Sequence, residues 1–193
     1  MKDRLEIRLS GSGGQGLLTA GIILAYALGI GEGKNVVQTQ SYGPEARGGA
    51  SRSDVVVSNG EIYNPKPSKL DILLCLNQES CDAFSSKLKE DGILIIDTDL
   101  VKEPQFENFV GAPFTKLAIE KFKTPVTANI IALGFLCGYI GLAKGSSLEL
   151  AIESRFNPKH VEINKKAAKL GYELGKTLQK EGKKKETDAR KKK

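Results

Sequence analysis

The sequence predicts an α/β protein: a Rossmann-like, mostly parallel sheet with a β-hairpin insertion and a C-terminal group of helices. Three observations favour this class. Apolar runs of strand length alternate with helical stretches through the first hundred residues. A glycine-rich loop stands between the first expected strand and the first expected helix. Beyond residue 124 the apolar pattern becomes helical.

The first expected elements lie on either side of the glycine-rich loop. Residues 4–11 alternate Leu and Ile with charged residues and end at Gly, which predicts a strand. The Ala-, Leu- and Ile-rich stretch that follows predicts a helix over 14–28. Residues 35–44 are typical of a second strand that runs into a loop. The short runs 53–57 and 61–63 flank an Asn-Gly pair, which predicts a β-hairpin.

Two continuous apolar runs predict buried parallel strands over 71–76 and 92–97, and a helix is expected between them over 78–89. The C-terminal half predicts helices over 127–142 and 146–156 and a third that begins at Pro158. Glycines at 134, 138 and 141 give the first of these helices a close-approach face. That face has two interpretations: it packs inside the domain, or it meets a partner subunit.

Length and composition describe one domain without a membrane span. The chain has 193 residues, of which 40% are hydrophobic and 27% are charged. No apolar run reaches the roughly 18 residues of a spanning helix, and the N-terminus lacks the apolar segment of a signal peptide. The three cysteines include no C-x-x-C spacing, which argues against a disulfide framework and against a zinc or iron–sulfur site built by this chain alone. We therefore expect a reducing, cytoplasmic location.

Most of the positive charge lies at the C-terminus. The formal net charge is +6, and the run EGKKKETDARKKK at 181–193 carries most of it. We expect one domain over 1–181 and a basic, disordered tail over 182–193. A nucleic-acid-binding role for the tail is one hypothesis. The chain shows no interleaved aromatic residues for base stacking, so no specific nucleic-acid partner is expected.

The glycine-rich loop is the first candidate binding site. The segment 11–16 satisfies G-x-G-x-x-G in the strand-to-helix context that anion binding requires. Its candidate residues are Gly11, Gly13, Gly14, Gln15 and Gly16. The second strand, VVQTQ at 36–40, lacks the acidic residue that grips the ribose of NAD. Three interpretations stay open: a dinucleotide, another phosphate-bearing ligand, or tight chain packing without a ligand.

The loop after the second strand is the second candidate site. Its candidate residues are Tyr42, Arg47, Gly48, Gly49 and Arg52. Ligands of open α/β sheets bind beyond the carboxyl ends of strands, so we expect both loops to face one crevice. The two arginines are then placed to clamp a phosphate or a carboxylate. The alternative is a pair of solvated arginines.

Three motifs carry a resemblance to a known family. They are GSGGQG at 11–16, SYGPEARGGASRSDVVVS at 41–58 and TANIIALGFLCGYIG at 127–141. Together they resemble the gamma subunit of 2-oxoacid:ferredoxin oxidoreductases, and the likeness extends to about residue 180. The second motif is most similar to members that act on 2-oxoglutarate or branched-chain 2-oxoacids, and we expect 2-oxoglutarate.

The resemblance implies a subunit of a larger enzyme. Such enzymes convert a 2-oxoacid and coenzyme A to acyl-CoA and CO₂ and reduce ferredoxin. Thiamine diphosphate, Mg²⁺ and iron–sulfur clusters are expected on alpha, beta and in some members delta (ferredoxin-like) partner subunits, and coenzyme A is the co-substrate. We expect no catalytic or metal-ligating residue here, an inactive isolated chain, and a solvated His160. The alternative function is a stand-alone nucleotide-binding module without catalysis.

Overall fold

A six-stranded sheet forms the centre of the computed structural model, which describes residues 3–41 and 50–191. The strands lie in the order β2-β3-β1-β4-β5-β6. Their bounds are Arg4–Ser12 for β1, Asn35–Ser41 for β2, Ala50–Ser58 for β3, Leu70–Cys75 for β4, Leu88–Asp97 for β5 and Phe109–Ala112 for β6. The helices are α1 (Leu17–Tyr26), α2 (Gln78–Phe84), α3 (Phe114–Phe122), α4 (Ala128–Ile140), α5 (Gly145–Arg155) and α6 (Pro158–Lys191).

The strand pairing confirms the expected mostly parallel sheet. β1, β4, β5 and β6 pair in parallel, whereas β3 is antiparallel to both β1 and β2. β2 therefore runs in the same direction as β1. The carboxyl ends of these two strands and the first residues of β3 lie at one edge of the sheet, where Ser12 is opposite Ala50.

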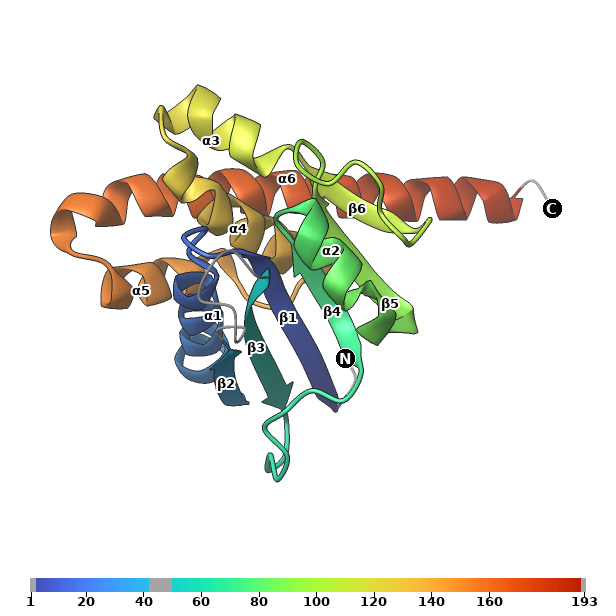
Figure 1. The fold of residues 1–193 in the computed structure, drawn as a ribbon, viewed down its shortest axis with the longest axis horizontal. Helices are drawn as coiled ribbons and strands as arrows, with labels where there is room; N and C mark the ends of the chain where they lie inside the picture. The colour runs from blue at the N-terminus through green and yellow to red at the C-terminus, as the bar shows by residue number, and fades with distance from the viewer. Residues whose placement is uncertain (1–2, 42–49, 192–193) are drawn as a thin grey trace.

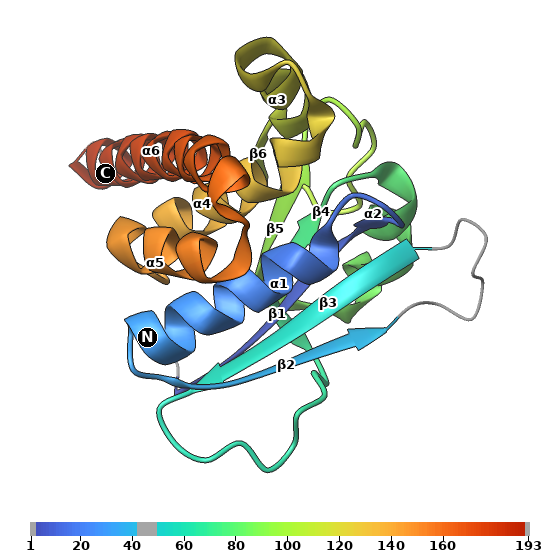
Figure 2. The ribbon, with the colours of Figure 1, turned by 90° about the vertical axis from the view of Figure 1, so that its left-hand side faces the viewer.

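The two faces of the sheet are covered unequally (Figures 1 and 2). Helices α1, α4, α5 and α6 lie on one face, and α2 lies on the other. On the α1 side, β1 contributes Leu5, Ile7 and Leu9 to the larger core. Residues of β1 alternate between the two faces, and on the α2 side the strand places the charged residue Arg8. Arg8 donates to both carboxylate oxygens of Asp54, at 2.7 and 2.9 Å.

The expected hairpin over 53–63 is wrong. Residues 53–58 belong to β3, which pairs with β1 and β2, and no strand follows Gly60 before β4. The backbone N–H of Asn59 donates instead to the carbonyl of Asp3. The insertion in the sheet is the antiparallel pair β2–β3, whose connection lies outside the described residues.

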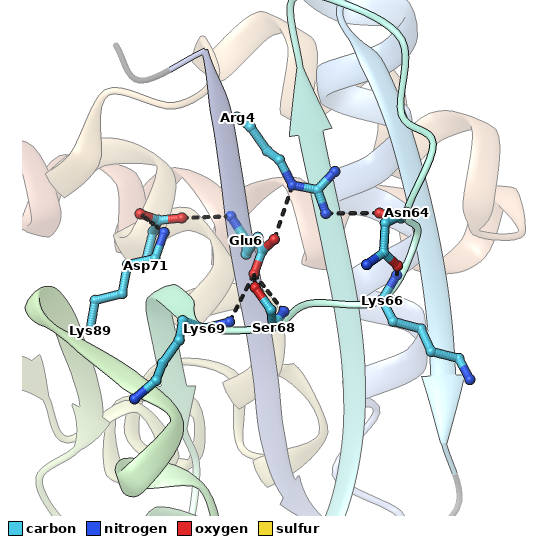
Figure 3. A network of polar contacts seen from close by, with 8 residues as sticks. All are labelled: Arg4, Glu6, Asn64, Lys66, Ser68, Lys69, Asp71 and Lys89. Carbon is cyan, nitrogen blue, oxygen red and sulfur yellow. Dashed lines mark hydrogen bonds and ion pairs between the residues drawn. The ribbon is translucent and has the colours of Figure 1, made fainter.

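A polar network holds the segment between β3 and β4 (Figure 3). The carboxylate of Glu6 accepts hydrogen bonds from the backbone N–H groups of Ser68 and Lys69, at 2.8 and 3.1 Å. Arg4 donates from Nε to the same carboxylate and from Nη2 to the carbonyl of Asn64. These side-chain contacts supply the hydrogen bonds that a strand pairing would otherwise give to this segment.

The glycine face of α4 packs inside the domain, against α6. A side chain at Gly134 or Gly138 would overlap backbone atoms of α6, and one at Gly171 or Gly175 would overlap those of α4. The reciprocal glycines let the two helix backbones approach each other directly. Gly141 has a different role: it ends α4 with a positive φ of 74°.

Cys137, on α4, is fully buried, and burial raises the pKa of its thiol to about 12. Cys75, in β4, is also buried. Cys81 is buried as well.

The C-terminal helix is longer than expected. α6 continues to Lys191, past residue 181, and its last turns project beyond the rest of the molecule (Figure 1). Residues 182–191 thus belong to α6, whereas the basic composition predicted a separate tail over 182–193. Within the described residues, no helix is long and apolar enough to cross a membrane.

Two elements have no counterpart in the sequence analysis, namely β6 and α3. Another boundary differs: α2 ends at Phe84, a 3-10 turn follows, and β5 already begins at Leu88.

Asp97, the last residue of β5, is fully buried and connects β5 to α3. Its carboxylate accepts hydrogen bonds from the N–H and the hydroxyl of Thr115 and so fixes the start of α3 at the carboxyl edge of the sheet.

Candidate functional site at the carboxyl edge of the sheet

The glycine-rich loop joins β1 to α1 through a tight turn. Gly14 and Gly16 have φ angles of 88° and 73°, in the left-handed region that favours glycine. Gly16 is the N-cap of α1 and offers no side chain to the first N–H groups of that helix. Gly13 and Gly14 are exposed, and a Cβ at either position would meet nothing within 4 Å. The turn therefore presents bare backbone at the start of a helix.

Gln15 closes this turn with its side chain. Its Oε1 accepts a hydrogen bond from the N–H of Ser12 at 2.7 Å, and its Nε2 donates to the carbonyl of Leu76 at 3.3 Å. Asn77 adds a second link, because its Nδ2 donates to the hydroxyl of Ser12 at 2.6 Å. The loop is thus tied to the end of β4, and Gln15 has a structural role in shaping it.

Asn129, in the first turn of α4, holds the other end of the loop. Its Nδ2 donates to the carbonyl oxygen of Gly16 at 2.9 Å. A side chain at Gly16 would overlap this amide. The glycine at position 16 is therefore required both by its positive φ and by the approach of α4.

A pocket of about 650 Å³ lies between the loop and the C-terminal helices. Its walls come from the starts of four helices. The N-cap Gly16 and Thr19 come from the start of α1, and Thr115 comes from the start of α3. The remaining lining residues are Gly14, Gln15, Leu76, Thr124, Pro125, Val126, Thr127, Ala128, Asn129, Phe156, His160, Ile163 and Asn164.

The electrostatics of this pocket favour a negatively charged group. No Asp or Glu is among its lining residues, and the first turns of the four helices contain no acidic residue. Helix N-termini carry partial positive charge and free N–H groups. At α1 no side chain caps those groups, whereas the 3-10 turn Pro125–Thr127 that leads into α4 is capped by the hydroxyl of Thr124, which accepts from the N–H of Val126. The pocket can accept an anion beside the glycine-rich loop.

The structure brings together only part of the expected site. Gly14, Gln15 and Gly16 line the pocket, whereas Gly11 lies in β1 and Gly13 in the exposed turn. Tyr42, Arg47, Gly48 and Gly49 lie outside the described residues. Their chain neighbours Ser41 and Ala50 are at the same sheet edge as the glycine-rich loop.

Arg52 does not reach this pocket. It lies opposite Ser10 on the α2 side of the sheet, because its neighbour Ser53 faces α1. Its guanidinium lies 5.7 Å from the ring centroid of Phe84 and 3.9 Å from the carboxylate of Asp54. Arg52 thus lies beside the buried pair formed by Arg8 and Asp54.

Several pocket residues were not candidates on sequence grounds. Thr115 lies in α3, Thr127 in the 3-10 turn before α4 and Asn164 in α6, and no motif connects them. His160 is exposed as expected, but it also lines the pocket from the first turn of α6. The only signal in the sequence was the Asn-Pro pair before it, which marks a helix start.

The comparison with protein families defines the class. The profile of the pyruvate ferredoxin/flavodoxin oxidoreductase family matches residues 6–174, and the chain belongs to this family. The family match spans the sheet, the glycine-rich loop and all of α4.

Individual relatives are similar to this chain over nearly its whole length. The chain is 45% identical to the 2-oxoglutarate synthase subunit KorC of Methanocaldococcus jannaschii, over 92% of this chain and 97% of that protein. It is 42% identical to the KorC subunit of Archaeoglobus fulgidus, over 93% and 92% of the two chains. Among solved structures, the keto/oxoacid ferredoxin oxidoreductase gamma subunit of Geobacter sulfurreducens superposes with a TM-score of 0.82 at 41% identity. That superposition covers 90% of this chain and 97% of the other.

Proposed function

We propose that this chain is the gamma-type subunit of a 2-oxoglutarate:ferredoxin oxidoreductase. The complex would convert 2-oxoglutarate and coenzyme A to succinyl-CoA and CO₂ and pass two electrons to ferredoxin. The observation that carries this proposal is the full-length similarity to two KorC subunits at 45% and 42% identity. The alternative of a stand-alone nucleotide-binding module has no comparable support.

The redox and decarboxylation chemistry is assigned to partner subunits. Iron–sulfur clusters take four cysteine thiolates, and this chain has three cysteines, all buried. Among the described residues, no group of three His, Cys, Asp or Glu side chains is placed to hold a metal ion. The residues present do not fit a cluster. Alpha and beta subunits, and a ferredoxin-like delta subunit where one exists, would carry thiamine diphosphate, Mg²⁺ and the clusters.

The contribution of this chain is to receive coenzyme A. The pocket beside Gly16 combines the uncapped start of α1 with a lining free of acidic residues, which suits the phosphates of that co-substrate. Arg47 follows β2, whose last residue, Ser41, lies at the same sheet edge. It would add a cation to the site. The three free cysteines suit a reducing compartment, so we place the complex in the cytoplasm.

Arg47→Ala in the assembled enzyme tests this assignment. Loss of one charged contact to a phosphate should raise the apparent KM for coenzyme A by about tenfold and leave the KM for the 2-oxoacid unchanged. Lys87→Ala is the control, because Lys87 is exposed at the opposite edge of the sheet, just before β5. An unchanged KM for coenzyme A in Arg47→Ala would remove Arg47 from the site.

A further inference from the structure

The segment 59–69, which connects β3 to β4, is exposed and yet held in a fixed position. It contains no helix or strand, and the two hydrophobic cores of the described residues include none of its side chains. Figures 1 and 2 show it projecting from the sheet edge opposite the glycine-rich loop. The length of β1 separates these two edges by about 27 Å. An ordered segment that packs no core is typical of a recognition surface.

Side chains at the edge of the sheet hold this segment at its start, its middle and its end. At the start, Lys34 donates from Nζ to Oδ1 of Asn59 at 2.7 Å. In the middle, Arg4 donates to the carbonyl oxygen of Asn64 at 2.8 Å. At the end, the carboxylate of Glu6, a residue that is only 6% exposed, accepts from two backbone N–H groups (Figure 3). The segment is therefore ordered before any partner binds, which lowers the entropy cost of association.

Tyr63 is the most prominent side chain of the segment. It is 88% exposed, the highest value among the large apolar side chains of the described residues. Its hydroxyl donates to the carboxylate of Glu61 at 2.6 Å, and this contact fixes the direction of the ring. Tyrosine offers a large, rigid contact area with few torsions to immobilise, and it is enriched among the residues that dominate binding at protein interfaces. A ring held outward in this way suits an apolar pocket on another protein.

The charge of the segment defines the surface that it fits. Lys66 and Lys69 are exposed, and in Figure 3 both side chains point away from the Glu6 network. Among the described residues, neither ammonium group has a carboxylate partner. Complementary interfaces bring opposite charges together, so the matching surface carries carboxylates. A second copy of this chain would bring the same lysines into a two-fold contact and be repelled.

We propose that the segment 59–69 is a docking surface for an acidic partner subunit of the complex. Tyr63 fills an apolar pocket of that subunit, and carboxylates at the rim of the pocket pair with Lys66 and Lys69. The identity of the partner as a subunit of the same complex rests on the proposed function. One edge of the sheet then receives the co-substrate, and the opposite edge holds the chain in the assembly.

Competition between tagged chains tests this surface in the assembled enzyme. Wild-type and variant chains are co-expressed with limiting amounts of the natural partner subunits, and mass spectrometry measures their ratio in the purified complex. We expect about thirtyfold less Tyr63→Ala than wild type, because an aromatic anchor at the centre of an interface is lost. Ile30→Ala, which truncates another exposed apolar side chain, is the control and should be incorporated like the wild type.

Charge reversal tests the acidic character of the partner in the same competition. Lys66→Glu combined with Lys69→Glu should lower incorporation by about tenfold or more, because each new carboxylate faces a carboxylate of the partner. Lys166→Glu combined with Lys169→Glu, an exposed pair at the same spacing on α6, is the matched control. Equal incorporation of the two double variants would contradict an acidic partner.

Stability measurements separate docking from folding. The ring of Tyr63 packs against no core, so Tyr63→Ala should unfold at the same urea concentration as the wild type. A lower midpoint would show a structural role and overturn the proposal. Full incorporation of Tyr63→Ala would overturn it as well and leave the proposed function standing. Tyr63-dependent dimers of this chain, or Tyr63-dependent binding of single-stranded RNA, would assign the surface to a different occupant and also overturn it. A wild-type chain that joins no complex would contradict the proposed function and the docking surface with it.

Discussion

Asn129 donates its side-chain amide to the carbonyl oxygen of Gly16 at 2.9 Å, across 113 positions of the chain. This contact connects the two motifs that stand furthest apart in the sequence. It sets the starts of α1 and α4 side by side on the pocket. The glycine-rich loop is therefore shaped from outside by a helix, as well as from inside by Gln15.

Gly16→Ala should damage both the fold and the site. Alanine is disfavoured at a φ of 73°, and its methyl group would overlap the amide of Asn129. We expect a loss of about 2 kcal/mol in the free energy of unfolding, measured with urea. Gly13→Ala is the matched control, since a Cβ there meets nothing within 4 Å. Equal stability of the two variants would contradict the role given to Asn129.

Gly138→Ala tests the close packing of α4 on α6. The added methyl group would overlap the carbonyl of Tyr172, so the helices must separate. Thermal unfolding should show a loss of about 3 kcal/mol. Gly182→Ala, on the exposed part of α6, should be neutral or stabilise the protein by up to about 1 kcal/mol, because alanine favours helix. If Gly138→Ala is tolerated as well as Gly182→Ala, the two helices do not pack as described.

Asp54→Asn should strongly destabilise the α2 side of the sheet. Arg8 and Asp54 are each 6% exposed and share two hydrogen bonds. The variant leaves a buried guanidinium without its countercharge, which costs about 3 kcal/mol. Asp82→Asn, on the exposed surface of α2, should change the urea midpoint little. A paired replacement, Arg8→Met with Asp54→Leu, should recover much of the loss. If the double variant stays as unstable as Asp54→Asn, the Arg8–Asp54 pair has a role beyond neutralising two buried charges.

Glu32→Gln should reduce the loss of folding stability that occurs as the pH falls into the acid range. Hydrogen bonds from the Ser147 hydroxyl and the Lys144 N–H lower the pKa of Glu32 below its usual 4.5. The folded state thus favours the charged form, and its stabilisation is complete above pH 4.5 and lost as the pH falls through the lowered pKa. At pH 7 we expect the variant to be less stable by about 1 kcal/mol. The difference should vanish in strong acid. A difference that persists there would show a cause other than charge.

Local patterns predicted most elements of this fold. The glycine-rich loop, the buried runs of β4 and β5 and the apolar α4 are all marked by residues that stand together in the chain. The sequence also predicted a close-approach face from the glycines of α4, but it did not predict which element packs against that face. Which helix accepts Gly134 and Gly138 depends on Gly171 and Gly175, which lie more than 30 positions away.

The errors come from contacts between distant residues. Asn59 and Gly60 predict a hairpin by local turn preference, yet the backbone of Asn59 pairs with Asp3, and Glu6 holds the segment that follows. Arg52 has the right residue type for an anion site, but the alternation of β3 turns it to the α2 face. Thr115 and Asn164 reach the pocket from α3 and α6, and no single segment of the sequence encodes that convergence.

The most direct test of the central claim is to purify this chain with its natural partners and measure viologen reduction. 2-Oxoglutarate, pyruvate and branched 2-oxoacids would each be supplied with and without coenzyme A. We expect association with thiamine- and cluster-bearing subunits and reduction that requires coenzyme A and is fastest with 2-oxoglutarate. A chain that purifies alone, or reduction that is independent of coenzyme A, would contradict the proposed function.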